Sequence, residues 1–96
     1  MVFTWDPRKA AANLVQHGVD FREAATAFDD PLSTTFPDAD HSVTERRFLL
    51  IGQSAQRRTL VVAHMERGET VHIISARTAT RRERKFYEEG KARSQR

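Results

Sequence analysis

The side chains in this sequence that could do chemistry are arginines, histidines and single carboxylates near the ends of apolar segments. Glu45 and Arg47 are two residues apart in ERRF, so in an extended strand they would point to one face. His64 follows the apolar run LVVA, and Arg77 follows IISA. Tyr87 lies in the arginine-rich stretch RRERKFY. These residue types can move protons and hold phosphate.

Metal-free cleavage of RNA needs only groups of this kind. A base takes the proton of the 2′-hydroxyl, an acid protonates the departing 5′-oxygen, and cations stabilise the charged phosphorane. Arginine suits the last task because its forked donors match phosphate oxygens. Glu45 or His64 could be the base, Tyr87 or His64 the acid, and Arg47 and Arg77 the cations. The inventory permits this reaction without demonstrating it, because most basic proteins offer the same groups.

Several other classes of enzyme are disfavoured. The four histidines are scattered, no H-x-x-x-H spacing joins them, and the chain has no cysteine, so no metal site is expected. The sequence contains neither a glycine-rich phosphate loop nor a serine in a nucleophile elbow. We therefore expect no metal and no cofactor.

The same residues also have structural interpretations. Glu45 and Arg47 could form a cross-strand salt bridge of little energy. His17 would lie in the last turn of a helix, where a cation suits the helix dipole. Phe86 is expected to face the core, which would leave Tyr87 at the helix border with its hydroxyl accessible.

Positive charge is concentrated at the C-terminal end. Residues 77–96 hold eight Lys and Arg against three Glu, whereas residues 1–76 hold eight against ten Asp and Glu. Such asymmetry suggests nucleic acid or an acidic protein as partner, although a solvated helix with a basic tail would show the same distribution of charge. MVFTWDPRK has no apolar run of signal-peptide or membrane-span length, so a cytoplasmic protein without a membrane partner is expected.

Local signals predict an α+β domain. Helices are expected at 7–17 and 21–28, and strands at 2–5, 33–36, 46–51, 59–65 and 70–76. A last helix begins after the capping-box pair Thr80 and Glu83 and ends at Gly90. We expect residues 1–90 to form a single domain and residues 91–96 to be a disordered basic tail.

Short turns between the later strands imply a mainly antiparallel sheet. Two N-terminal helices would pack on one face of it and leave the other face open for a ligand. Strict alternation along residues 70–76 would put His72, Ile74 and Ala76 on one face, with Val71, Ile73 and Ser75 on the other.

Three stretches in order give a resemblance to a known family: FTWDPRKAAANLVQHGVDFREAATAFDDP, DADHSVTERRFLLIGQS and LVVAHMERGETVHIISARTATRRERKFYEE. Together they cover nearly all of residues 3–89. The chain resembles the BrnT toxins of bacterial type II toxin–antitoxin pairs, which have a RelE-like fold. The resemblance implies a ribonuclease that blocks translation. It also implies a BrnA-like ribbon–helix–helix antitoxin, through which the complex would bind promoter DNA.

Motif matches carry over a set of candidate residues, namely Lys9, His17, Glu45, Arg47, Arg77, Arg81, Glu83 and Tyr87. We expect RNA to be bound or steered by Lys9, His17, Arg81, Arg84 and Lys85. His72 is a departure, because the family usually has arginine at this place. If that arginine contacts phosphate, this chain would bind RNA more weakly or with a pH dependence.

Two hypotheses of different class follow. One is a metal-independent endoribonuclease toxin whose site is the open sheet face. The other is a non-catalytic basic module that binds an acidic partner or nucleic acid, since the sequence shows no unambiguous acid–base pair. Cleavage of RNA in the presence of EDTA would distinguish them.

Overall fold

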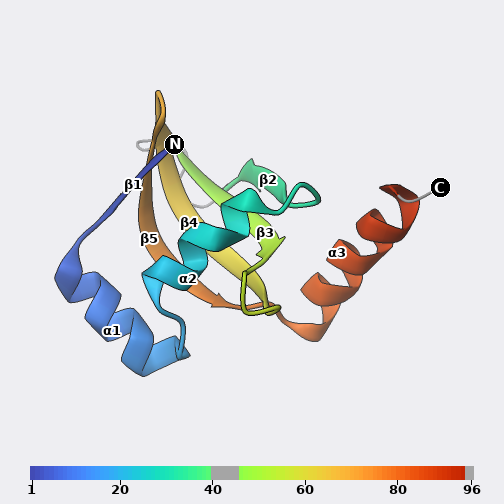
Figure 1. Ribbon diagram of the computed structural model, residues 1–96, viewed down its shortest axis with the longest axis horizontal. Coiled ribbons are helices and arrows are strands. Elements are labelled where there is room, and N and C mark those ends of the chain that lie inside the picture. Colours follow the sequence, from blue (N-terminus) through green and yellow to red (C-terminus); the bar gives the residue numbers. More distant parts are fainter. Residues whose placement is uncertain (40–45, 95–96) are drawn as a thin grey trace.

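A five-stranded sheet carries the other elements of the chain in the computed structural model, which describes residues 1–39 and 46–94 (Figure 1). The strands stand in the order β1-β5-β4-β3-β2, with β1 parallel to β5 and the other pairs antiparallel. The α+β class and the mainly antiparallel sheet are confirmed. The bounds are β1 Val2–Trp5, α1 Pro7–His17, α2 Phe21–Thr26, a 3-10 turn Ala27–Asp29, β2 Thr34–Pro37, β3 Arg47–Gln53, β4 Thr59–Arg67, β5 Thr70–Thr78 and α3 Arg81–Ser94.

The first helix begins and ends where its local signals predict. The Asp6 carboxylate accepts a hydrogen bond from the backbone N–H of Arg8, and Pro7 occupies the first turn. Gly18 closes α1 in the left-handed conformation with φ of 68°, and its N–H donates to the carbonyl of Leu14. This cap turns the chain back so that α2 can start within a few residues.

Helices α1 and α2 cover one face of the sheet, which we call the inner face, and the opposite face is the outer face (Figure 1). The main core lies between these helices and the inner face. Its fully or almost fully buried members are Val19, Phe21, Ala24, Leu60, Val62, Val71, Ile73 and Ala76. Burying such apolar side chains is the dominant favourable term in folding. The expected packing of both N-terminal helices on one face is thus confirmed.

Helix α3 covers one end of the outer face through Tyr87. Tyr87 is only 6% exposed and packs with Ile51 and Val61, whereas Phe86 is 45% exposed. The prediction that Phe86 faces the core and Tyr87 the border was therefore wrong. The tyrosine occupies the buried position because its ring meets the sheet while its hydroxyl reaches a carboxylate on the loop before β2.

The last helix is also longer than predicted. It continues through Gly90 to Ser94, so the predicted helix end at Gly90 was wrong. Glycine lowers helix stability by only about 1 kcal/mol relative to alanine, and it ends a helix where it takes up a left-handed conformation. Gly90 has no positive φ. Residues 91–94 of the expected tail are therefore helical.

One extra residue in β5 changes which side chains share a face. Ala63 of β4 pairs with Ser75, but the next residue, His64, pairs with Ile73, so Ile74 is left over as a bulge. Beyond the bulge the alternation is reversed. Ala76 therefore joins Val71 and Ile73 in the inner core, and the predicted grouping of Ala76 with His72 was wrong.

The bulged strand is held from the side by Asn13 of α1. The Asn13 amide donates to the carbonyl of Ala76 at 2.8 Å and to that of Val19 at 3.0 Å, and its oxygen accepts the N–H of Ala76 at 3.0 Å. Asn13 is buried, so these bonds are shielded from water. Beyond the end of β1 the side chain takes the place of a neighbouring strand, because it satisfies both backbone groups of Ala76.

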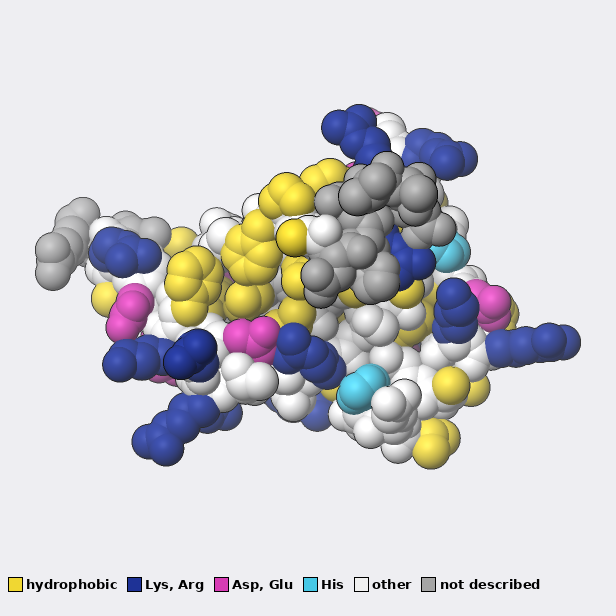
Figure 2. Space-filling view, turned by 180° about the vertical axis from the view of Figure 1, so that it is seen from behind, with side chains coloured by type: hydrophobic (Ala, Val, Ile, Leu, Met, Phe, Trp, Pro, Cys, Tyr) yellow, Lys and Arg dark blue, Asp and Glu magenta, His cyan; other side chains and the backbone are white. Residues whose placement is uncertain are grey.

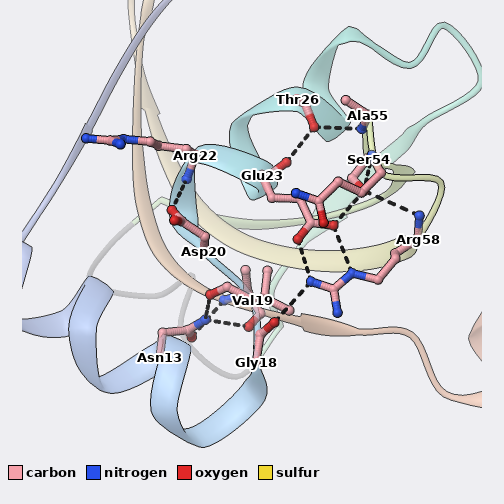
Figure 3. A network of polar contacts seen from close by, with 12 residues as sticks. Asn13, Gly18, Val19, Asp20, Arg22, Glu23, Thr26, Ser54, Ala55 and Arg58 are labelled. Carbon is pink, nitrogen blue, oxygen red and sulfur yellow. Dashed lines mark hydrogen bonds and ion pairs between the residues drawn. The ribbon is translucent and has the colours of Figure 1, made fainter.

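A second polar network ties α2 to the turn between β3 and β4 (Figure 3). The buried Glu23 carboxylate accepts hydrogen bonds from Arg58 Nε at 2.9 Å, from a second Arg58 nitrogen and from Ser54 Oγ at 2.7 Å. Arg58 also donates to the carbonyl of Gly18 at 3.0 Å. Glu23 thus serves as a tertiary anchor of α2. These bonds outweigh the effect of burial and lower the Glu23 pKa, the hydrogen bond from Arg58 being the main cause.

We predict that Asn13→Ala destabilises the protein by about 2–4 kcal/mol, because it leaves buried backbone groups of Ala76 without partners. Urea unfolding followed by Trp5 fluorescence measures the change. Gln16→Ala, an exposed substitution in the same helix, is the control and should change the free energy of unfolding by less than about 0.5 kcal/mol. Equal effects of the two substitutions would contradict this role of Asn13.

Candidate functional site

Two strands present arginines on the outer face, one toward each end of it. Arg47 is opposite Met65, which is opposite His72, so these three side chains form one row across β3, β4 and β5. Arg77 is opposite Val61 at the other end of β5, in the part of the face that α3 covers. The bulge places Arg77 on the same face as His72.

Arg77 holds the start of α3. Its two terminal nitrogens donate to the two carboxylate oxygens of Glu83 at 2.7 and 3.0 Å, a forked pair. The same carboxylate accepts the N–H of Thr80 at 2.8 Å, and Thr80 Oγ1 accepts the N–H of Glu83 at 3.2 Å, so the predicted capping box forms. The Arg77 guanidinium lowers the pKa of Glu83 to about 2, and Glu83 raises the pKa of Arg77. The ion pair therefore stays charged throughout the physiological range.

Tyr87 is the second anchor of α3. Its hydroxyl donates a hydrogen bond to the Asp30 carboxylate, which also accepts the N–H of Gln53 at 2.8 Å and of Leu32 at 2.9 Å. Burial and the neighbouring carboxylate raise the pKa of Tyr87 well above its usual value. Burial opposes ionisation of Asp30, but its three hydrogen bonds outweigh burial and lower its pKa. The phenol therefore keeps its proton and is committed to the Asp30 carboxylate.

His64 lies on the inner face and is 0% exposed. Its ring is edge-on to Phe28, with centroids 4.8 Å apart, and stacks on Phe48 at 5.9 Å. Its Nδ1 lies 3.2 Å from the carbonyl of Val62, and its Nε2 lies 2.9 Å from a Glu66 oxygen. The sheet itself thus separates His64 from Arg47 and Arg77.

The other predicted residues fall into three groups. The Arg81, Arg84 and Lys85 side chains are exposed on α3, beside the outer face. Lys9 and His17 are exposed on α1, in the helical layer of the inner face. Glu45 lies outside the described residues. Figure 2, which views the outer face, shows hydrophobic side chains at its centre and Lys and Arg side chains around its edge.

A groove lies at the end of the outer face away from α3. It has a volume of about 540 Å³ and is lined by Thr4, Arg46, Met65, Glu66, Arg67, Thr70 and His72. Two of these lining residues contact each other, because Nδ1 of His72 lies 2.8 Å from Thr4 Oγ1. Nothing in the local sequence indicates that Thr4 would contact His72 or that Asp30 would contact Tyr87, since 68 and 57 residues separate the members of these two pairs.

The described residues contain no cluster of His, Cys, Asp or Glu that could hold a metal ion. In the same part of the chain, no helix is both long and apolar enough to cross a membrane.

The match to a family decides the classification. The model of the family described as "Ribonuclease toxin, BrnT, of type II toxin-antitoxin system" matches residues 5–83. The chain belongs to the BrnT family. Among solved structures it is similar to the Brucella abortus ribonuclease toxin BrnT, at 26% identity and a TM-score of 0.63. That match covers 84% of this chain and 100% of the Brucella chain, and no curated protein matches.

The family match includes several of the residues that the outer face presents. Residues 5–83 contain Arg47, His72, Arg77 and Glu83, but end before Tyr87. The forked pair that anchors α3 thus lies within the BrnT region of the chain. The contact between Tyr87 and Asp30 uses a residue beyond it.

We predict that Glu83→Gln lowers the free energy of unfolding by about 1 kcal/mol at pH 7, because the pair with Arg77 is partly exposed and screened. The folded-state pKa of Glu83 is lowered from 4.5 to about 2, so its stabilisation is complete above pH 4.5 and is lost as pH falls through 2. In urea unfolding, the difference in free energy of unfolding between wild type and variant should therefore shrink as the pH falls from 5 to 2. Exposed Glu88→Gln is the matched control in the same helix. A gap of constant size at all pH values would contradict this assignment.

Proposed function

We propose that this BrnT-family protein is a metal-independent endoribonuclease that needs no cofactor, cuts RNA in the cytoplasm and thereby blocks translation. Arg47 and Arg77, from separate strands, share the outer face beside a helix that exposes Arg81, Arg84 and Lys85. Such a face suits a phosphate backbone, and the chain belongs to a family of ribonuclease toxins.

Arg47 and Arg77 bind the scissile phosphate and stabilise the phosphorane. A guanidinium has five N–H groups. Contacts of Arg77 within residues 1–39 and 46–94 use three of them, on Glu83 and the carbonyl of Thr78, so two remain for a phosphate. Arg77 can thus anchor α3 and contact RNA at the same time.

The reaction is an attack of the 2′-oxygen on phosphorus with departure of the 5′-oxygen. Glu45 acts as the base that takes the 2′-hydroxyl proton. His64 and Tyr87 take no part in the proposed chemical steps, because His64 lies on the inner face and the Tyr87 hydroxyl is bound to Asp30. The cations of α3 steer RNA to the site, so they affect association rate and salt dependence more than chemistry.

The protein partner is an antitoxin, and we propose that it is a BrnA-like ribbon–helix–helix protein. The concentration of positive charge in residues 77–96 suits an acidic segment of such a partner. The complex would contact promoter DNA through the antitoxin. A small neighbouring gene for a ribbon–helix–helix protein would support this setting.

We predict that Arg77→Ala lowers RNA cleavage in EDTA by about 100-fold or more, as expected for loss of a group that stabilises transition-state charge. Arg47→Ala should act similarly, and both variants should relieve growth arrest. Cleavage is measured on a short labelled RNA with purified protein.

Two controls separate chemistry from folding. Glu83→Gln breaks the same ion pair but keeps Arg77, so it should cleave far faster than Arg77→Ala. Arg22→Ala removes an exposed arginine from α2 and should cleave like wild type. A folded Arg77→Ala protein with full activity would overturn the site. Intact RNA with wild type, together with tight partner binding, would favour a non-catalytic module.

A further inference from the structure

The groove at the open end of the outer face is built around one imidazole. His72 is half-buried in β5, between Thr4 of β1 and Met65 of β4. A contact of 2.8 Å joins its Nδ1 to Thr4 Oγ1. A threonine hydroxyl can accept a hydrogen bond from Nδ1–H or donate one to an unprotonated Nδ1, so this contact holds the ring in either protonation state.

The other ring nitrogen is available to a ligand. Within the described part of the chain, Nε2 of His72 makes no hydrogen bond to protein. Because Nδ1 is held at the β1 side, Nε2 is the atom left to exchange a proton with a molecule in the groove. His64 differs, since both of its ring nitrogens face protein acceptors.

The charged groups around the groove favour an anion. Arg46 and Arg67 line it, and Arg47 flanks Met65 in the same row as His72. Glu66 is the one lining carboxylate among the described residues, and it is paired with His64. The ring of His72 therefore lies among cations that attract a phosphodiester.

An acid is also what the cleavage reaction lacks. The departing 5′-oxygen must gain a proton, yet Tyr87 is bound to Asp30 and His64 lies on the inner face. Of the histidines that the structure describes, His17 lies on α1, so His72 is the one on the outer face.

We propose that His72 is the general acid of RNA cleavage and that Thr4 is its positioning residue, an inference that rests on the proposed function. As the bond from the 2′-oxygen to phosphorus forms and the bond from phosphorus to the 5′-oxygen breaks, Nε2–H passes its proton to the 5′-oxygen. The imidazolium becomes neutral imidazole, with Nδ1–H still donating to Thr4. The 2′-hydroxyl proton leaves to the base, and the products are a 2′,3′-cyclic phosphate and a 5′-hydroxyl.

The test compares two RNA substrates in EDTA, one with the natural 5′-oxygen and one with sulfur at that bridging position. A thiol has a pKa near 8.5, so the thiolate departs without an acid. We expect His72→Ala to slow the oxygen substrate by about 100-fold or more and the sulfur substrate by less than about 5-fold. His72→Gln, which keeps a polar group beside Thr4, should give the same contrast. Thr4→Val should also slow the oxygen substrate more than the sulfur substrate, but by a smaller factor.

Three other outcomes would contradict either the acid assignment or the proposed function. Equal slowing of both substrates by folded His72→Gln would overturn the acid assignment and make His72 a phosphate ligand. Unchanged cleavage of the oxygen substrate by folded His72→Ala would also overturn it. Failure of the wild-type protein to cleave either substrate would instead refute the proposed function. Gln16→Ala, on α1, should cleave both substrates like wild type.

Discussion

The single extra residue that β5 carries opposite β4 determines which side chains the outer face can present. With strict alternation, Arg77 would point to the same side as Val71 and Ile73, into the helical layer. The bulge at Ile74 reverses the order, so Ala76 enters the core and Arg77 emerges beside Val61. A charged guanidinium in the core would be costly, so burial of the small Ala76 and exposure of Arg77 both favour the bulged register. Asn13 then satisfies the backbone of Ala76, where β1 no longer reaches.

Helix α3 divides the outer face that the bulge creates. The forked pair of Arg77 with Glu83 fixes where α3 starts, and the contact of Tyr87 with Asp30 fixes its position further along. One end of the face is therefore covered by apolar packing. The other end holds the groove, whose lining includes His72, Arg46 and Arg67.

The sequence predicted those features that depend on near neighbours. Asp6, Gly18 and the pair Thr80 and Glu83 act within a few residues, so helix starts and the first helix end were correct. The bulge was missed because it depends on pairing between two strands. The burial of Tyr87 was missed because it depends on Asp30, which is 57 residues away.

For the site residues, the kind of side chain was easier to predict than the face of the sheet on which it lies. Arg47 and Arg77 were expected on the outer face and lie there, but His64 lies behind the sheet with both ring nitrogens engaged. Whether a strand-end histidine points in or out depends on register, and a shift of one residue reverses it. Thr4 and His72 meet only because β1 is parallel to β5, and nothing in the local sequence indicates that pairing.

Under the proposed function, RNA lies on the outer face of the sheet rather than on the helical layer. The most direct measurement is a nuclear magnetic resonance titration of the labelled protein with a short RNA that carries 2′-O-methyl groups and so cannot be cleaved. We expect the changes in backbone amide chemical shift to be largest in β3, β5 and α3, and the ring signals of His72 to move while those of His64 stay. Shifts concentrated in α1 and α2, with β5 and His72 unchanged, would contradict it.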